Sequence, residues 1–190
     1  MQIRMELLPV LSIGWLNGWI FQIIFFTLFG IFLLTCSKEV ITRLYDEEGW
    51  TKVQRTLSKI AKIFGLITLI FFIFTPLNID SVEFIIGFTL IIIGIIGFLI
   101  ALINFKNSPL NKPITIGLYK LSRNPQILMM YLFSIGNCLV IGSWIALITF
   151  SLSIIFGHFR ILGEEKRLTE QYGESFLEYK KKVSRYFIFF

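Results

Sequence analysis

Charged residues, histidine and cysteine are scarce in this sequence. Only 16% of its 190 residues are charged, and it contains one histidine, His158, and two cysteines, Cys36 and Cys138. A soluble domain carries about 25% charged residues, so the low charge argues against an ordinary water-exposed surface. Both cysteines lie in apolar stretches without disulfide or metal-site spacing. A single histidine gives no cluster of metal ligands, and we expect no metal in this protein.

Apolar and aromatic residues take the place of the missing charge. Hydrophobic residues make up 55% of the chain, 21 residues are phenylalanine, and the mean hydropathy is +0.77. A soluble core cannot absorb so much apolar surface, so the chain is predicted to be an all-α, multi-pass transmembrane protein. The net charge of +6 does not indicate nucleic acid, because the basic residues lie between apolar runs.

Long stretches without charge predict five membrane spans. These stretches are residues 12–36, 63–79, 84–105 and 126–159. Pro9 lies just before the first, where a helix can start. The last stretch is too long for one span and is interrupted at Gly142 and Ser143, which predicts a helix–turn–helix hairpin. Its arms of about 16 residues measure about 24 Å, shorter than a hydrocarbon core of about 30 Å, so they should extend into their charged flanks.

The chain divides into two regions at the end of the third span. Residues 1–103 hold three spans, and residues 104–190 hold a cytosolic connector, the hairpin and an interfacial tail. In the first region, Gly87, Gly94 and Gly97 would let another helix approach closely, although glycine is also simply common in membrane helices. The tail is charged but amphipathic, and we expect an interfacial helix pair broken at Gly173.

The distribution of charge predicts the orientation. If the N-terminus is outside, the inside segments hold 17 of the 18 Lys and Arg residues, and only Arg4 is left outside. These inside segments are residues 37–62, 104–125 and 160–190. The Ile- and Phe-rich composition hints at a prokaryotic source of low GC content. We therefore expect an integral protein of a prokaryotic cell membrane with these segments in the cytoplasm.

The two ends of the hairpin carry groups suited to binding or chemistry. Asn124 and Pro125 form a strong helix start, in which Asn caps the helix and Pro fills its first turn. Such an end, with Arg123 beside it, attracts anions. Arg160 and Glu164 share one helical face, where they can pair or hold a zwitterion between them. Each feature also has a purely structural explanation: Asn124 as a helix cap, Arg123 as a positive-inside residue, and Arg160 with Glu164 as a surface ion pair. Ionisable groups held at membrane level are nevertheless functional candidates.

Three ordered motifs resemble the signatures of a known superfamily. They are Gly117-Leu-Tyr119-Lys-Leu-Ser-Arg123-Asn124-Pro125, Arg160-x-x-x-Glu164-Glu165, and the tail from Tyr172-Gly173 to Val183. Together, over residues 111–185, they resemble the isoprenylcysteine carboxyl methyltransferase and phospholipid methyltransferase superfamily of integral membrane methyltransferases. The sequence departs from the superfamily pattern at Asn124, where His is common, at Ile127, where Tyr is usual, and at Met129, where Gly is frequent.

This resemblance implies a methyltransferase that uses S-adenosyl-L-methionine, held in a pocket at the cytosolic ends of the last helices. The implied cofactor-binding residues are Lys112, Pro113, Ile114, Tyr119, Asn124, Pro125, Gln126, Ile127, Glu164 and Glu165. The implied catalytic residues are Arg160 and Glu164, and Arg160 and Arg123 would bind the substrate. The implied partners are the bilayer and a lipid or prenylated small-molecule or peptide acceptor, and the active site would face the cytoplasm.

The acceptor remains open between two chemistries. A carboxylate, such as that of isoprenylcysteine, is already ionised and needs only orientation, for which Arg160 is a natural clamp. A phospholipid amine must first lose a proton to a base. The groups available as a base are Glu164, Glu165, Tyr119 and His158.

Two other classes of function also remain open. A membrane scaffold that has lost its activity is motivated by Ile127 and Met129, and its hairpin would be packed shut by Met129, Met130 and Phe133. A nicotinamide-dependent membrane reductase would share a related hairpin, although such enzymes are usually much longer.

Overall fold

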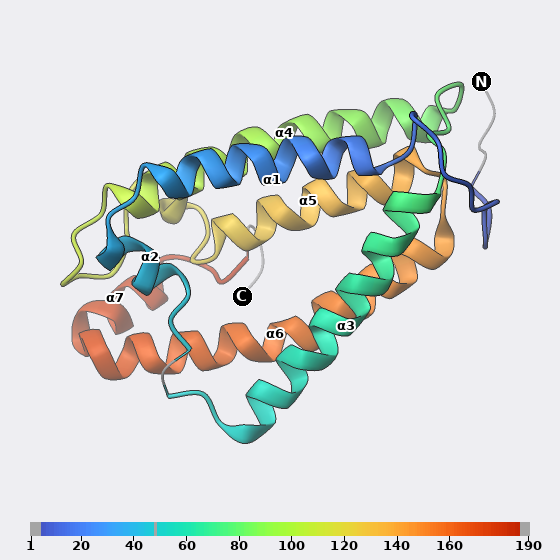
Figure 1. Cartoon of the computed structure of the whole chain (residues 1–190). Coiled ribbons are helices and arrows are strands. Elements are labelled where there is room, and N and C mark those ends of the chain that lie inside the picture. Colours follow the sequence, from blue (N-terminus) through green and yellow to red (C-terminus); the bar gives the residue numbers. More distant parts are fainter. Residues whose placement is uncertain (1–4, 48, 187–190) are drawn as a thin grey trace.

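The computed structural model describes residues 5–47 and 49–186, and it is all-helical (Figure 1). The α-helices are α1 (Trp19–Leu34), α2 (Lys38–Leu44), α3 (Lys52–Phe74), α4 (Val82–Lys106), α5 (Pro125–Val140), α6 (Trp144–Tyr172) and α7 (Glu174–Lys182). A short 3₁₀ helix, η1 (Gly117–Lys120), lies in the connector between α4 and α5. The all-α prediction is confirmed.

Among the described residues, three helices are long and apolar enough to cross a membrane: α3, α4 and α6. The other two predicted spans correspond to α1 and α5, which are apolar but have only 16 residues each. The chain is therefore an integral membrane protein with three candidate spans of full length and two shorter apolar helices. At 1.5 Å per residue the short helices measure about 24 Å.

The first helix begins at Trp19, so the prediction that its span starts at Ser12 is wrong. The preceding segment is tied to the end of α3 instead. Asn17, which is 1% exposed, donates from Nδ2 to the carbonyls of Ser12 (2.7 Å) and Ile73 (3.0 Å). The Ser12 N–H also donates to the Phe74 carbonyl, at 2.7 Å. These bonds satisfy backbone groups of Ser12 and of the last turn of α3, and they hold the segment before α1 against α3.

The charged residues before the second predicted span belong to the same helix as that span. α3 begins at Lys52 with a capping box, in which Thr51 Oγ1 accepts from the Gln54 N–H (3.2 Å) and Gln54 Oε1 accepts from the Thr51 N–H (2.9 Å). The charged residues from Lys52 onward therefore form the first turns of a 23-residue helix that continues as the span.

The helices form two arms that diverge from one end (Figure 1). α5 packs along α4, while α6 packs along α3. A turn at Gly142, which has a φ of 61°, joins α5 to α6. These two helices contact each other much less than α5 contacts α4 or α6 contacts α3. The predicted hairpin is thus present as a turn between consecutive helices, but its arms form a V instead of a packed pair.

Glycines allow the close contact between α4 and α5. A Cβ atom at Gly87 would lie 2.6 Å from the Gly136 carbonyl oxygen, and one at Gly94 would lie 2.6 Å from the Phe133 backbone nitrogen. The backbones approach closely enough to exclude a side chain, so the predicted role of Gly87 and Gly94 is confirmed.

The charged segments lie at the open end of the V (Figure 1). α2, the connector between α4 and α5, and α7 gather there. At the opposite end, the Glu6 N–H donates to the Gly142 carbonyl, and the Asn78 N–H donates to the Val140 carbonyl, each at 2.8 Å. α6 continues without a break into the charged region and ends at Tyr172, before Gly173 with its φ of 55°. The predicted extension of this arm and the break at Gly173 are confirmed, but the extension predicted for the other arm is wrong, because α5 begins at Pro125.

Candidate functional site

A cavity of about 520 Å³ lies between the two arms, in the half of the molecule that holds the charged segments. This volume is in the range of small-molecule sites, about 300–1,000 Å³. The wall from α1 and α4 is aromatic and includes Phe25, Phe29 and Phe98. α2 and α6 contribute charged groups, including Arg43 and Glu164. The cavity therefore combines an apolar wall with ionic groups near the charged end.

Most of the predicted site residues line this one cavity. They are Pro113, Ile114, Tyr119, Arg123, Asn124, Gln126, Ile127, Arg160, Glu164 and Glu165. Two predicted residues do not line it: Lys112 is exposed, and Pro125 is fully buried as the first residue of α5. Motif residues on the two sides of the hairpin thus meet around a common space, because the V opens toward the ends that carry them.

Arg160 and Glu164 form an ion pair at the cavity. Arg160 Nε donates to Glu164 Oε1 at 2.8 Å, and both side chains are partly exposed. The guanidinium also lies over the indole ring of Trp50, 5.3 Å from its centroid. A guanidinium has five donors and a carboxylate has two acceptor oxygens, so both groups keep capacity for a ligand. The pair can hold the two charges of a zwitterion.

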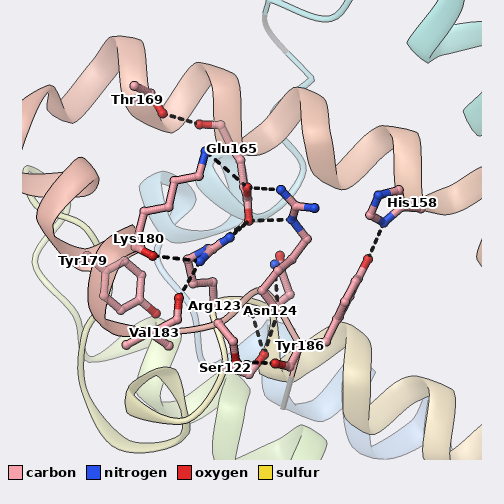
Figure 2. A network of polar contacts seen from close by, with 12 residues as sticks. Ser122, Arg123, Asn124, His158, Glu165, Thr169, Tyr179, Lys180, Val183 and Tyr186 are labelled. Atoms are coloured by element: carbon pink, nitrogen blue, oxygen red, sulfur yellow. Dashed lines mark hydrogen bonds and ion pairs between the residues drawn. The ribbon is translucent and has the colours of Figure 1, made fainter. Parts of the chain in front are cut away.

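Glu165 lies next to Glu164 in sequence but has a different environment (Figure 2). Its side chain is 5% exposed and pairs with the 6% exposed side chain of Arg123, with Nη2 and Oε1 2.9 Å apart. Arg123 Nε donates to the same oxygen at 2.9 Å. Arg123 Nη1 donates to the carbonyls of Lys180 and Val183. The donors of Arg123 are therefore engaged by protein groups.

Asn124 occupies the predicted N-cap position, but the prediction that its side chain caps α5 is wrong. Its side chain makes no capping bond, and Nδ2 donates instead to the Arg185 carbonyl at 3.4 Å. The Asn124 N–H donates to Ser122 Oγ at 3.1 Å. The tertiary contact with the C-terminal segment replaces the local cap, while Pro125 opens the helix as expected.

Tyr119 lies in η1 and is buried in a cluster with Val40, Phe105 and Ile114. The Tyr179 hydroxyl donates to the Tyr119 carbonyl at 2.6 Å. Burial raises the pKa of both phenols above the ordinary value, so both remain protonated at neutral pH. Tyr119 can therefore act as a hydrogen-bond donor more readily than as a base. His158, another candidate base, places Nδ1 2.8 Å from the Tyr186 hydroxyl and is not among the residues that line the cavity.

The hairpin is not packed shut. The Met129 side chain lies against Gly97 of α4, and Phe133 stacks on Phe25 of α1 with their ring centroids 4.4 Å apart. Only Met130 of the three residues considered for closure lines the cavity. The structural sign expected of an inactive scaffold is therefore missing.

Two residues that bear on the cavity were not identified from the sequence: Arg43 lines it, and Trp50 contacts the lining residue Arg160 without lining it. Trp50 contacts Arg160, and Arg43 donates to the connector carbonyls of Pro109 (3.1 Å) and Lys112 (3.0 Å). Their positions depend on contacts between segments far apart in sequence, so no local pattern marks them. The only local indication of a role for Trp50 is that it is an isolated tryptophan in a charged segment.

The lining residues suit S-adenosyl-L-methionine. The side-chain nitrogen of Gln126 is buried without a hydrogen-bond partner in the part of the chain that the structure describes, and this residue lines the cavity. The Glu164 carboxylate fits the ammonium group of an amino acid, and the aromatic wall fits a planar base. The donor set and the cavity volume are therefore compatible with the cofactor.

Fold and site together define an all-helical integral membrane protein with a cavity at its charged end. Residues 82–175, from α4 to the start of α7, match the phospholipid methyltransferase family, in agreement with the resemblance of the sequence motifs. Members of this family are S-adenosylmethionine-dependent membrane methyltransferases, and the predicted enzyme class is confirmed at this level. Neither a curated protein nor a solved structure matches the chain.

Proposed function

We propose that this protein is an S-adenosyl-L-methionine-dependent integral membrane methyltransferase that acts on a lipid-borne or apolar acceptor. The observation that carries the proposal is the shared cavity, in which the motif residues and an aromatic wall from α1 and α4 face one space. Polar and apolar surfaces in one cavity would allow a polar cofactor and an apolar acceptor to bind next to each other. By the positive-inside rule, the cavity faces the cytoplasm.

The cofactor is held mainly by residues at the start of α5 and in the middle of α6. Gln126 offers an unpaired amide donor, and Glu164 offers a carboxylate for the ammonium group. Ile114 and Ile127 provide apolar contacts. When bound, the cofactor supplies an electrophilic methyl group. Lys112 was predicted to contact the cofactor but does not line the cavity, and its role is indirect, because its carbonyl anchors the connector to Arg43.

Arg160 orients the acceptor. A carboxylate acceptor would take up its free donors, while Trp50 holds the guanidinium plane in position. For a phospholipid amine, Glu164 is the best-placed base, because it lines the cavity and is partly exposed. Arg123 and Glu165 support the site through their buried ion pair, since their contacts leave little capacity for direct binding.

Binding of the cofactor to purified protein in detergent tests this proposal. S-adenosyl-L-methionine should bind in isothermal titration calorimetry, and Glu164→Ala should abolish binding, because it removes the carboxylate at the cavity. Glu170→Ala is the matched control, since this glutamate is in the same helix but 63% exposed. Unchanged affinity in Glu164→Ala would show that the site is assigned wrongly.

Two further measurements separate the alternatives. Thermal shift with a reduced nicotinamide cofactor should give no stabilisation, and stabilisation by that cofactor alone would favour a reductase. Methyl transfer from labelled S-adenosyl-L-methionine should then be compared between prenylated cysteine and vesicles that contain phosphatidylethanolamine. Transfer to one and not the other identifies the acceptor chemistry.

A further inference from the structure

Because α5 and α6 form a V, the width of the cavity between them depends on contacts at the open end. The turn at Gly142 joins the two helices at the closed end, and they contact each other little beyond it. At the open end, the buried Arg123–Glu165 pair connects the start of α5 to α6 directly. A second connection between the start of α5 and α6 would fix the shape of the cavity further.

The C-terminal segment, residues 183–186, supplies that second connection (Figure 2). On the α5 side, the Arg123 N–H donates to the Ser184 carbonyl at 2.9 Å. Ser122 Oγ and Asn124 Nδ2 both donate to the Arg185 carbonyl, at 2.9 and 3.4 Å. The backbone of this segment therefore binds three consecutive residues that lead into α5.

The same segment is fixed to α6 by side chains. Arg185 Nη2 and Glu165 Oε2 are 2.8 Å apart, and Arg185 Nε donates to Glu165 Oε1 at 3.0 Å. This is a two-point contact between guanidinium and carboxylate, the geometry that favours arginine over lysine. The Tyr186 hydroxyl also lies 2.8 Å from His158 Nδ1, two turns earlier in α6. Arg185 thus joins both sides of the cavity through one residue.

We propose that Arg185 is a positioning residue that fixes the start of α5 relative to α6 and thereby sets the affinity for the cofactor. The inference rests on the proposed function. Through its carbonyl, Arg185 holds Asn124, and through its guanidinium it holds Glu165, which adjoins Glu164. Both Asn124 and Glu164 line the cavity, while Arg185 is not among the lining residues.

Binding and kinetics of Arg185 variants test the inference. Arg185→Met should raise the Kd for S-adenosyl-L-methionine about tenfold, which corresponds to about 1.4 kcal/mol. It should raise the KM for S-adenosyl-L-methionine in parallel and change the KM for the acceptor less than about twofold. Arg185→Lys should recover part of the affinity, because lysine keeps the charge but makes one contact. Lys181→Met is the control, since this side chain is 74% exposed in the same tail.

The outcomes separate this inference from the proposed function. A wild-type protein that fails to bind S-adenosyl-L-methionine refutes the proposed function. Normal wild-type binding with an unchanged Kd in folded Arg185→Met refutes the inference alone, as does an equal rise in the KM for the acceptor. If Arg185→Met does not fold, Arg185→Lys and Ser122→Ala decide, because each weakens one side of the connection. Both should raise the Kd, and unchanged binding in both would overturn the inference.

Discussion

Replacing Glu165 by glutamine should destabilise the protein far more than the same change at other glutamates of α6. Glu165 is buried and faces Arg123, Arg185 and Lys180. In Glu165→Gln the carboxylate charge is lost while the three cations remain. Arg185 and Lys180 are partly exposed and can turn toward water, but Arg123 is buried and cannot. Most of the cost should therefore come from Arg123.

The expected loss is about 3 kcal/mol, toward the lower end of the cost of removing one partner from a buried ion pair, because the amide oxygen still accepts a hydrogen bond. Glu170→Gln provides the comparison, since Glu170 forms an exposed pair with Lys166 at 3.8 Å. Such surface pairs contribute about 0–1 kcal/mol. Reversible unfolding in mixed detergent micelles measures the free energy of unfolding of both variants. A loss below about 1 kcal/mol in Glu165→Gln would refute the assignment of Glu165 as the central anion of this network.

Two further variants test the packing of the arms and the acceptor side of the site. Gly94→Ala should lose about 1–3 kcal/mol of stability, because its Cβ would meet the Phe133 backbone, whereas Gly30→Ala, with nothing within 4 Å, should be neutral or slightly stabilising. Equal melting temperatures for both would contradict the close packing of α4 and α5. Arg160→Lys should raise the KM for the acceptor and leave cofactor affinity nearly unchanged, because lysine loses the planar contact with Trp50. A selective loss of cofactor affinity would instead assign Arg160 to the cofactor.

The contacts that the sequence did not predict all join distant segments. Asn17 bonds to a carbonyl 56 residues away, which is why α1 starts later than its uncharged stretch indicates. Asn124 has the right residue type and position for a cap, yet a carbonyl 61 residues away takes its side chain. A residue's type and position allow several side-chain hydrogen bonds, and the tertiary contacts determine which one forms.

The sequence by itself determined the class of the protein and the end of the molecule at which its site lies. Uncharged stretches require helices, because a bilayer offers no partners for free backbone groups. Charge between these stretches places the polar motifs together at one end. Only the tertiary structure decided that α5 packs on α4 and α6 on α3, so that the hairpin opens as a V around a cavity. The reason is physical: glycine contacts favour the α4–α5 pair, and the resulting gap is spanned by Glu165, Arg123 and Arg185, whose partners no local pattern specifies.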